Sequence, residues 1–533
     1  MRAAAFILVL LACAAAQAER VKRQAEQPSE EETLKKLCAG KGPGEWFRLN
    51  AGQEHCKRVV QCTSAGLQQI KCPQGLVFDV ENQSCDWKDN VFNCDQTARE
   101  VKAKPLLNTD EPICTVAGEL ACADASCIKK ELFCDGIEQC SDGSDENACD
   151  NGNDPNRAPP CDSEKCKLPS CFCSEDGTTV PGNLDPRDIP QMVVLTFNGA
   201  INNNNIDLFD EIFQSGRTNP NGCPIKGTFF VSHRYTNYTA VQDLHARGHE
   251  VAVFSISQND TRNYWKNASR ADWAKEMGGQ RFIIEKFAGI NDNSVVGMRT
   301  PFLRIGGNNQ FFMMDKQKFL YDSTITAPLS DIPIWPYTLL NQMPHACHGD
   351  AQKCPTRAFP VWEMVMNELD RRDDPSVDDN LPGCIMVDSC SNIRTTEQFY
   401  NFLNHNFDRH YLTNRAPISL NFQQSAWLKQ NEFLDTLMYW IDEIRQTFPE
   451  TYFVTMTQVI EWMQNPRTLA ETQAFDSWQI KCEEPLPFVC SKPGGNNCAL
   501  HVDEVPGTFN MQTCQRCPTN LPWLSDPTGE GFL

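Results

Sequence analysis

Between residues 190 and 465, short apolar runs alternate with stretches in which apolar residues recur every three or four positions. The runs predict buried strands at 192–197, 227–231, 251–256, 383–387 and 418–422. The recurrences predict amphipathic helices over 206–213 and 434–448. Alternation of strands and helices on this scale favours a parallel α/β barrel or a doubly wound sheet. In both folds the functional side chains lie at the carboxyl ends of the strands, so we look for chemistry there.

The chain begins with a different hydrophobic pattern. Arg2 precedes a short apolar run over residues 6–15, and Ala16-Gln17-Ala18 follows it. This pattern predicts a secretory signal over residues 1–18. The run is too short to span a bilayer, and no later stretch approaches the roughly 20 apolar residues that a span requires. We therefore expect a secreted protein without a membrane span. Residues 19–37 form a polar linker, in which the basic run 20–23 is either a processing site or solvated linker.

Cysteines divide the rest of the chain. Of 27 cysteines, Cys13 lies in the predicted signal, which leaves the even number 26. Export makes disulfides the expected state of clustered cysteines. Sets of six fall within residues 38–94 and within 113–150, and both segments are too small to hold a large core without disulfides. A connector over 151–189 holds four more, for which we favour disulfides over zinc. A cysteine-rich tail covers 466–533.

Charge and sequons narrow the possible partners. The formal charge of −21 argues against nucleic acid, which needs a basic surface, but is compatible with a neutral polysaccharide. Four sequons agree with export and predict glycosylation at Asn82, Asn237, Asn259 and Asn267.

Residues 38–94 resemble the peritrophin-A type of chitin-binding domain. Their six-cysteine spacing carries the resemblance, together with the strings 44–47, 61–63, 75–79 and 85–87. It implies a small β-rich module that binds chitin. Flat aromatic rings suit the apolar faces of sugar rings. The candidate chitin-binding residues are Trp46, Phe47, Phe78 and Trp87, and we expect some of them, Phe78 first, to be core.

Residues 113–150 resemble an LDL-receptor class A repeat, on the string that runs from Cys134-Asp135-Gly136 through residues 140–146 to Cys149. The resemblance implies the disulfides Cys114–Cys127, Cys122–Cys140 and Cys134–Cys149. It also implies one calcium ion, which prefers six or more oxygen ligands. These would come from Leu132, Asp135, Ile137, Gln139, Asp145 and Glu146. The family normally has Asp where this chain has Gln139, so we expect weakened calcium binding. The alternative is that the acidic cluster is only a solvated loop.

The region 161–533 resembles the polysaccharide deacetylases of carbohydrate esterase family 4, and the module order resembles that of arthropod chitin deacetylases. The resemblance implies a distorted (β/α) barrel. Active members use a divalent metal, held by one Asp and two His, to activate water and polarise the amide carbonyl. A second Asp acts as the base, and a His acts as the acid.

In this chain the residues at those positions lack the required chemistry. The family motif Thr-Phe-Asp-Asp is replaced by Thr-Phe-Asn198-Gly199, so the base and the metal carboxylate are both missing. The motif His-Ser-x-x-His begins with Phe254 and ends with Gln258, neither of which is a good zinc ligand. Gln424 takes the place of the acidic His, although the adjacent Gln423 leaves that register uncertain. We expect no catalytic zinc.

Other residues of the family site are retained. Arg299 would orient the base in an active relative, the Phe302 amide would help to stabilise the oxyanion, and Asp388 belongs to the fourth motif. Without a base, a pair between Arg299 and Asp388 would be structural. His245 and His249 have the spacing of a helical metal pair, but the intervening Gly248 should end the helix and separate them.

Three functions are compatible with these observations. The leading hypothesis is a secreted chitin-binding protein of a chitinous matrix, either cuticle or peritrophic matrix, with a catalytically inactive deacetylase-like domain. The alternative is an active chitin deacetylase that hydrolyses the N-acetyl groups of chitin. A third hypothesis makes the LDL-receptor module dominant, with a ligand or lipoprotein partner. Chitin is the expected partner, and other matrix proteins are possible partners.

Overall fold

The computed structural model describes residues 46–531 with gaps, and it divides into two compact units, Met1–Pro112 and Ile113–Leu533. The predicted signal and linker, Asn82 and Cys149 lie outside the described residues. The gaps are 51–55, 64–65, 73–75, 81–83, 89–90, 92, 95, 97–113, 115, 117, 136, 147–153, 262, 350–351, 372–382, 480–481, 483–489 and 491–493.

The first unit is the β-rich module that the sequence predicts. A three-stranded antiparallel sheet contains β1 (Trp46–Phe47), β2 (Arg58–Thr63) and β3 (Gly66–Lys71), and a hairpin joins β4 (Leu76–Asp79) to β5 (Ser84–Trp87). Disulfides join Cys56 to Cys94 and Cys72 to Cys85. Phe78, only 1% exposed, packs against Val59 in the core. Disulfides and a few buried side chains thus stabilise this small module together.

The second unit begins with the calcium-type module. Its hairpin pairs β6 (Glu119–Ala121) with β7 (Cys127–Lys129), and the 3₁₀-helix η2 (Lys130–Leu132) follows. The disulfides Cys114–Cys127 and Cys122–Cys140 are present as the resemblance implied. The connector after it carries the disulfides Cys161–Cys173 and Cys166–Cys171, so its four cysteines are paired rather than bound to zinc.

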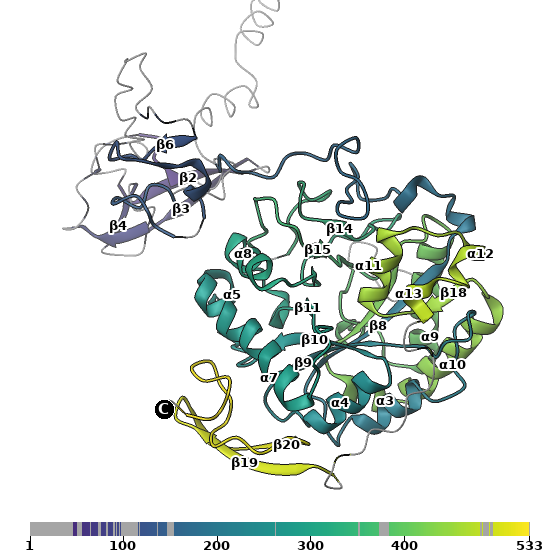
Figure 1. The fold of residues 1–533 in the computed structure, drawn as a ribbon. Helices are drawn as coiled ribbons and strands as arrows, with labels where there is room; N and C mark the ends of the chain where they lie inside the picture. The colour runs from purple at the N-terminus through teal and green to yellow at the C-terminus, as the bar shows by residue number, and fades with distance from the viewer. Residues whose placement is uncertain are drawn as a thin grey trace, which may run out of the picture. The chain divides into compact units, whose positions relative to one another are not determined.

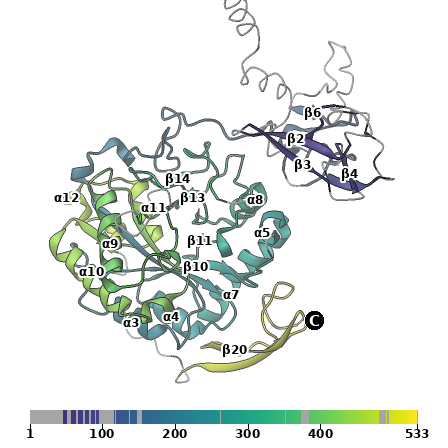
Figure 2. The same ribbon diagram turned by 180° about the vertical axis from the view of Figure 1, so that it is seen from behind.

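The large domain is built on a curled, mostly parallel sheet, seen in Figures 1 and 2. Its strand order is β14-β15-β12-β11-β10-β9-β8-β17, with β18 also paired to β8, and only β14 runs antiparallel to its neighbour. The strands are β8 (Gln191–Gly199), β9 (Thr228–Ser232), β10 (Glu250–Ser255), β11 (Gly297–Met298), β12 (Tyr321–Asp322), β14 (Tyr337–Thr338), β15 (Trp362–Glu363), β17 (Ile418–Phe422) and β18 (Thr451–Phe453). A separate short pair joins β13 (Thr326–Ala327) and β16 (Met366–Asn367).

Helices surround this sheet, as Figures 1 and 2 show from opposite sides. They are α3 (Ile206–Ile212), α4 (Tyr238–Ala246), α5 (Tyr264–Asn267), α6 (Arg270–Trp273), the π-helix η6 (Ala274–Gly278), α7 (Gly279–Ala288), α8 (Asn308–Gln317), α9 (Thr396–Tyr411), α10 (Phe433–Thr447), α11 (Met456–Gln464), α12 (Leu469–Thr472) and α13 (Asp476–Gln479). Short 3₁₀-helices complete the connections: η4 (Pro181–Asn183), η5 (Pro186–Asp188), η7 (Pro301–Leu303), η8 (Val387–Ser389) and η9 (Ser425–Lys429).

Strand β8 shows why the sheet is buried on both faces. Successive side chains of a strand point to opposite faces. Val193, Leu195 and Phe197 therefore join the core under the helices, while Met192 and Val194 join a second core on the inner face of the curl. The Phe197 ring packs against four other phenylalanines, from α3 and its C-terminal cap, β9 and β17: Phe209, Phe213, Phe229 and Phe422. The distorted barrel that the resemblance implied is thus present as a curled half-barrel with two apolar layers.

Four of the five predicted strands are present, and the prediction for 383–387 is wrong. Cys384 makes only an isolated bridge to Leu369, and the chain then turns into η8. The disulfide Cys384–Cys390 closes a loop six residues apart in sequence, which an extended strand could not do. The predicted helices are present as α3 and α10.

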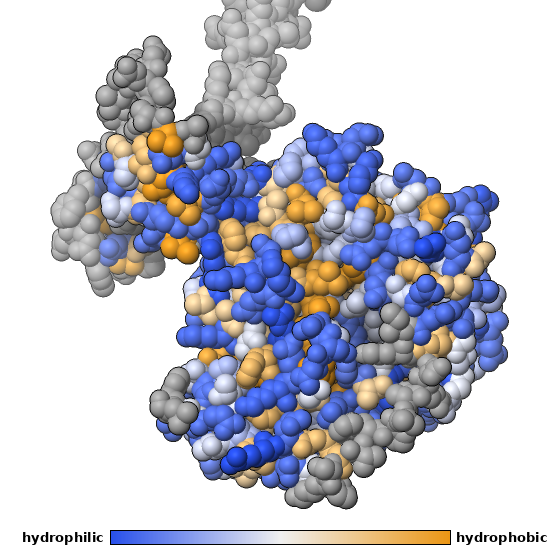
Figure 3. Space-filling view, in the orientation of Figure 1, coloured by the Kyte–Doolittle hydropathy of each residue, from blue (hydrophilic) through white to orange (hydrophobic). Residues whose placement is uncertain are grey.

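The tail forms the hairpin β19 (Asn496–Val502) and β20 (Val505–Thr513), held by the disulfides Cys490–Cys514 and Cys498–Cys517. A long-range disulfide joins Cys223 to Cys482. On the face drawn in Figure 3, hydrophobic residues gather in the middle of the large domain inside a hydrophilic rim. Among the described residues, no helix combines the length and the apolar character needed to cross a bilayer.

Candidate functional site

The carboxyl ends of the parallel strands bring the sequence-predicted residues together. Asn198 and Gly199 end β8, Arg299 directly follows β11, and Asp388 lies in η8, which packs against β17. Several turns at these ends have positive φ. Ser255 has φ 106°, Gln258 has φ 50° and Phe302 has φ 57°. Such backbone costs of order 1–3 kcal/mol per residue and persists where the surroundings enforce it, most often at functional sites.

Asn198 and Arg299 are the centre of a buried hydrogen-bond network. Arg299 donates from Nη1 to Asn198 Oδ1 at 3.0 Å and from Nη2 to Asn421 Oδ1 at 3.0 Å. Asn198 donates from Nδ2 to Gln423 Oε1 at 2.8 Å. The amide of Asn198 therefore uses its acceptor and its donor at once, which fixes its orientation. A carboxylate here would keep the bond from Arg299 but would turn an oxygen toward the Gln423 oxygen.

The guanidinium of Arg299 is fully buried, and its partners in these bonds are neutral. It also donates to Thr196 Oγ1 and to the Ser323 carbonyl and hydroxyl oxygens, and it lies 4.0 Å above the Phe230 ring centroid. Burial lowers the pKa of Arg299 to about 9. Five hydrogen bonds and an aromatic face replace the ion pair that a buried cation usually needs.

The structure separates the roles of the two adjacent glutamines and corrects one expectation. Gln423 sends its side chain into the Asn198 network, whereas the Gln424 side chain is exposed. Both backbone amides donate to Asp388, at 3.0 and 2.7 Å. Asp388 and Arg299 form no ion pair with each other among the described residues, because each is already held by other groups. A structural Arg299–Asp388 pair, which the sequence left open, is therefore not formed. Burial raises the pKa of Asp388.

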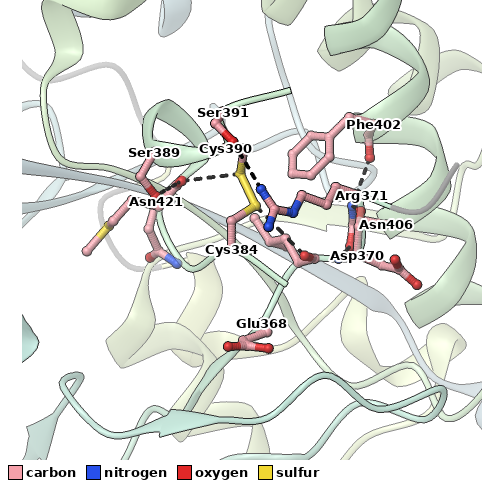
Figure 4. The surroundings of a disulfide bond; sticks show 12 residues. Glu368, Asp370, Arg371, Cys384, Ser389, Cys390, Ser391, Phe402, Asn406 and Asn421 are labelled. Carbon is pink, nitrogen blue, oxygen red and sulfur yellow. Dashed lines mark hydrogen bonds between the residues drawn. A yellow bond between two sulfur atoms is a disulfide. The ribbon is translucent and has the colours of Figure 1, made fainter. Parts of the chain in front are cut away.

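A disulfide holds the loop that carries Asp388. Cys384 and Cys390 flank it, and Figure 4 shows this bond beside Ser389 and Asn421. Asn406 of α9 braces the preceding segment by donating to the Asp370 carbonyl and accepting from its amide, both at 2.7 Å. Covalent closure and these bonds hold the fourth motif in place.

The second motif begins with a buried phenyl ring at the end of β10 and continues into a tight turn. Phe254 is 2% exposed and packs in the inner core with Phe230 and Ala252. The next turn is held by Glu276 of η6, which accepts from the Ser257 amide at 3.0 Å and from the Ser257 hydroxyl. Burial raises the pKa of Glu276. This turn presents Gln258 where the family resemblance would have a second metal-binding His.

Gly199 lies at the remaining metal position. A Cβ built on it would meet no atom within 4 Å, so space for a side chain exists. Its φ of 108° nevertheless belongs to a region that residues with a Cβ rarely adopt. A carboxylate could therefore be introduced here with room to spare but with some backbone strain.

No group of three or more His, Cys, Asp or Glu side chains in the described part of the chain is arranged to hold a metal. The two histidines spaced like a helical pair are separated as expected. His245 lies in α4 and meets Asp292 at 3.0 Å. His249 follows Gly248, is buried, and accepts from the Gly227 amide at 3.2 Å. Burial lowers the pKa of His249 well below its usual value.

Two carboxyl groups that the sequence did not single out lie close to Arg299. Asp322 and Glu363 are paired residues of neighbouring strands, and both are fully buried. Burial raises the pKa of Asp322 to about 7 and the pKa of Glu363 well above its usual value. A hydrogen bond between the two side chains acts in opposite directions, because it lowers the pKa of Asp322 and raises the pKa of Glu363. Burial therefore favours protonation of this pair. The signal that could have found them is their position as the last residues of β12 and β15, at the carboxyl ends where the site lies.

Three of the six predicted calcium ligands, Asp135, Gln139 and Asp145, lie in contact in the second small module. Asp135 and Asp145 are 7% and 1% exposed. Gln139 donates from Nε2 to Asp135 Oδ1 at 3.2 Å, and its amide nitrogen donates to Asp145 Oδ2 at 2.7 Å. The Gln139 Oε1 is buried and without a hydrogen-bond partner among the described residues. Buried carboxylates around an orphaned amide oxygen fit a hard cation such as calcium.

The chitin-type module corrects part of the aromatic prediction. Phe47 and Phe78 are 3% and 1% exposed, so their ring faces cannot cover a sugar, because they fill the small core instead. Trp46 is partly exposed and flanks that core from β1. Trp87 ends β5. Trp46 and Trp87 remain the chitin-binding candidates.

The sequons in the large domain lie at or near the surface. Asn267 is exposed, and Asn237 and Asn259 are partly exposed. Asn237 also caps α4, because its Oδ1 accepts from the Thr239 and Ala240 amides. Its Nδ2, the atom that a glycan would take, is not used in the cap.

Two family models match the small modules. Residues 38–94 match the chitin binding Peritrophin-A domain, and residues 113–149 match the low-density lipoprotein receptor domain class A. Among solved structures, a "probable polysaccharide deacetylase" from Pseudomonas aeruginosa is 14% identical, covers 52% of this chain and 92% of its own, and has a TM-score of 0.34.

Two curated relatives come from Bombyx mori. Chitin deacetylase 8 is 36% identical over 383 residues, which cover 70% of this chain and 94% of that protein. Chitin deacetylase 1 is 60% identical over 528 residues, which cover 98% of this chain and 97% of that protein. With that identity over almost its whole length, this chain belongs to the chitin deacetylase family.

Proposed function

We propose that this chain is an exported chitin-binding protein of a chitinous extracellular matrix, and that its deacetylase-like domain does not hydrolyse chitin. The observation that carries the proposal is the Asn198 network. At the position of the family's base, an amide is locked by Arg299 and Gln423 and cannot take up a proton at neutral pH.

The proposed loss of catalysis extends to the metal. Gly199 offers no side chain, Phe254 offers a buried phenyl ring, and Gln258 offers an amide. Zinc in hydrolytic sites is held by imidazole and carboxylate, and it must be held before it can lower the pKa of a bound water. Without ligands for the metal and without a base, neither the nucleophile nor the polarised carbonyl can form.

The retained loops support a binding role for the same surface. Phe302 is 54% exposed in η7, next to Arg299, and its positive φ is kept although the chemistry is lost. An exposed ring beside amide side chains suits the alternating apolar and polar faces of a sugar polymer. The proposal therefore includes a second, weaker sugar-binding surface besides Trp46 and Trp87.

Calcium and glycans belong to the proposal as structural elements. One calcium ion would be held by the side chains of Asp135, Gln139, Asp145 and Glu146 and by the carbonyls of Leu132 and Ile137, and it would fix the loop around Gln139. Glycans at the four sequons and export through the predicted signal suit an extracellular protein. Other matrix proteins are further partners to be sought.

An active chitin deacetylase is the second candidate, favoured by the 60% identity to a relative that carries that name. The two candidates are separated by one preparation of purified full-length protein. Retention on chitin beads and acetate release from chitin oligomers are measured together, with zinc or cobalt added. We expect retention without acetate release. Metal-dependent acetate release by the unmodified chain would overturn the proposal.

A variant that restores the family's residues, the reversed variant, tests whether these substitutions account for the proposed loss of catalysis. It carries Asn198→Asp, Gly199→Asp, Phe254→His, Gln258→His and, in two versions, Gln423→His or Gln424→His. We expect metal binding and measurable acetate release in at least one version, with a matched control, Asn203→Asp, that adds a carboxylate at an exposed position and gives neither. Stoichiometric zinc in the unmodified protein, equal to that in the reversed variant, would contradict the assignment of the lost ligands.

A further inference from the structure

A pocket of about 470 Å³ lies beside the loop that carries Arg299 and Phe302. The charged side chains that line it are cationic, although the protein as a whole is acidic. Four cationic side chains line it, Arg157, Lys266, Lys353 and Arg357, and no Asp or Glu is among its lining residues. The chain as a whole carries a formal charge of −21. A cluster of four cations in such a protein creates a local field that attracts anions.

Among the described residues, three of the pocket's four cations have no carboxylate partner, and the fourth, Arg357, is paired with Asp154. Arg157, Lys266 and Lys353 have no ion pair with a carboxylate in the part of the chain that the structure describes. Arg357 is 7% exposed; its Nε donates to Asp154 Oδ2 at 3.0 Å and its Nη1 to the Glu131 carbonyl at 2.9 Å. Its Nη2 is buried and has no hydrogen-bond partner among the described residues. That nitrogen has almost no solvent-accessible surface, so the cations open to a ligand are Arg157, Lys266 and Lys353.

The pocket is preformed and is attached to the candidate site. The disulfide Cys347–Cys354 closes the loop that carries Lys353. Gln352 donates from Nε2 to the Leu303 carbonyl at 2.8 Å and accepts from the Ile305 amide at 3.1 Å. A Cβ on Gly307 would lie 2.9 Å from the Lys353 side chain, so the lysine stem runs directly along that turn. The cations are thus fixed next to the loop that carries Phe302.

The other residues that line the pocket indicate the chemistry of the ligand beyond its negative charge. Besides the cations, it offers the amides of Asn341 and Gln342 and the apolar side chains of Leu339 and Met343. The volume lies within the roughly 300–1,000 Å³ of small-molecule pockets and is larger than one inorganic anion needs. Cations, amides and apolar surface together match a sugar ring that carries an acidic group.

We infer that this pocket binds an anionic sugar unit, bearing sulfate or carboxylate, with the acidic group paired to Lys266 and Lys353. The site is separate from the family's metal centre, so the inference stands whether or not the domain hydrolyses chitin. With this site the protein recognises acidic substituents on a polysaccharide, in addition to binding neutral chitin.

The test is calorimetric titration of the full-length protein with three probes: a sulfated glucosamine disaccharide, the neutral N-acetylglucosamine disaccharide and inorganic sulfate. We expect the sulfated disaccharide to bind at least tenfold more tightly than either of the others. Its affinity should fall as salt rises, because charge pairs are screened. Equal affinity for the neutral disaccharide, or for inorganic sulfate alone, would overturn the inference.

Variants locate the binding. Lys266→Gln combined with Lys353→Gln should weaken the sulfated disaccharide at least tenfold, while Lys318→Gln, which removes an exposed lysine outside the pocket, should leave it unchanged. A second readout uses the unmodified protein, in which the sulfated disaccharide should protect Lys266 and Lys353 from acylation. Unchanged affinity in the double variant, or unprotected lysines at saturation, would place the ligand elsewhere and refute the assignment.

Discussion

The substitution Glu363→Gln tests the buried carboxyl pair beside Arg299. In the unfolded chain both carboxyl groups titrate near pH 4. In the folded protein the pKa of Asp322 is raised to about 7 and that of Glu363 lies well above its usual value, chiefly because both groups are buried. The folded state therefore binds more protons than the unfolded state between about pH 4 and 7. Stability is greatest below this window and is lost as the pH rises through it.

The size of the effect follows from the proton count. One extra bound proton changes the free energy of unfolding by ~1.4 kcal/mol per pH unit. For Asp322 alone, the window from 3.8 to about 7 corresponds to a loss on the order of 4 kcal/mol, since the group has no solvent to screen it. Glu363 extends the loss to higher pH.

Glutamine at 363 removes one of the two titrating groups. Its Oε1 can still accept from the Ile325 amide, which donates to Glu363 at 3.1 Å, and its Nε2 can donate to Asp322 without a shared proton. We expect a flatter pH profile for Glu363→Gln, with a Tm several degrees above that of the unmodified protein at pH 8 and little difference at pH 5. Thermal unfolding followed by circular dichroism from pH 5 to 8.5 measures both.

Glu397→Gln is the matched control, because Glu397 is exposed on α9 and its substitution should leave the profile unchanged. Parallel profiles for Glu363→Gln and the unmodified protein would refute the reasoning. So would a Glu363→Gln variant that is less stable at every pH, since that result would mean that the carboxyl proton is not the source of the pH dependence.

Three further outcomes are expected. Phe197→Ala should lower the free energy of unfolding by about 3–5 kcal/mol in urea titrations, because a fully packed ring is lost; a loss below about 1 kcal/mol would contradict that packing. Trp46→Ala should reduce retention on chitin beads with the fold intact, whereas Phe78→Ala should unfold the module, and the reverse pattern would exclude Trp46 as a binding residue. Gln139→Asp should bind calcium about tenfold more tightly by calorimetry, since it restores a charged oxygen ligand, and chelation should lower its Tm more than that of the unmodified protein.

The sequence predicted the sheet well because parallel strands are buried on both faces. Continuous apolar runs at residues 192–197 and 251–256 therefore mark β8 and β10 without ambiguity. The run at 383–387 has the same composition, but the Cys384–Cys390 bond turns it into a loop. Disulfide pairing depends on which cysteines meet in space, so the pattern of side chains alone could not reveal this.

The residues of the candidate site were also predicted only in part from the sequence. Asn198, Arg299 and Asp388 were found from the motifs of the family resemblance, and of the three only Asn198 follows a predicted strand that is present. The choice between Gln423 and Gln424 needed the direction of each side chain, which the turn after β17 decides. Asp322 and Glu363 lie far apart in sequence and become neighbours only through the pairing of β12 with β15.

The Cys223–Cys482 bond spans 259 residues and encloses the chain from β9 to α13 in one covalent ring. A protein anchored to a polymer bears tension along its chain, and a pull applied at the two ends travels through this bond instead of through the enclosed strands. Under load the enclosed strands, β9 to β18, are therefore bypassed, whereas β8 lies outside the ring and stays in the loaded path. Single-molecule stretching should show this as a contour length that increases by the enclosed segment only after chemical reduction.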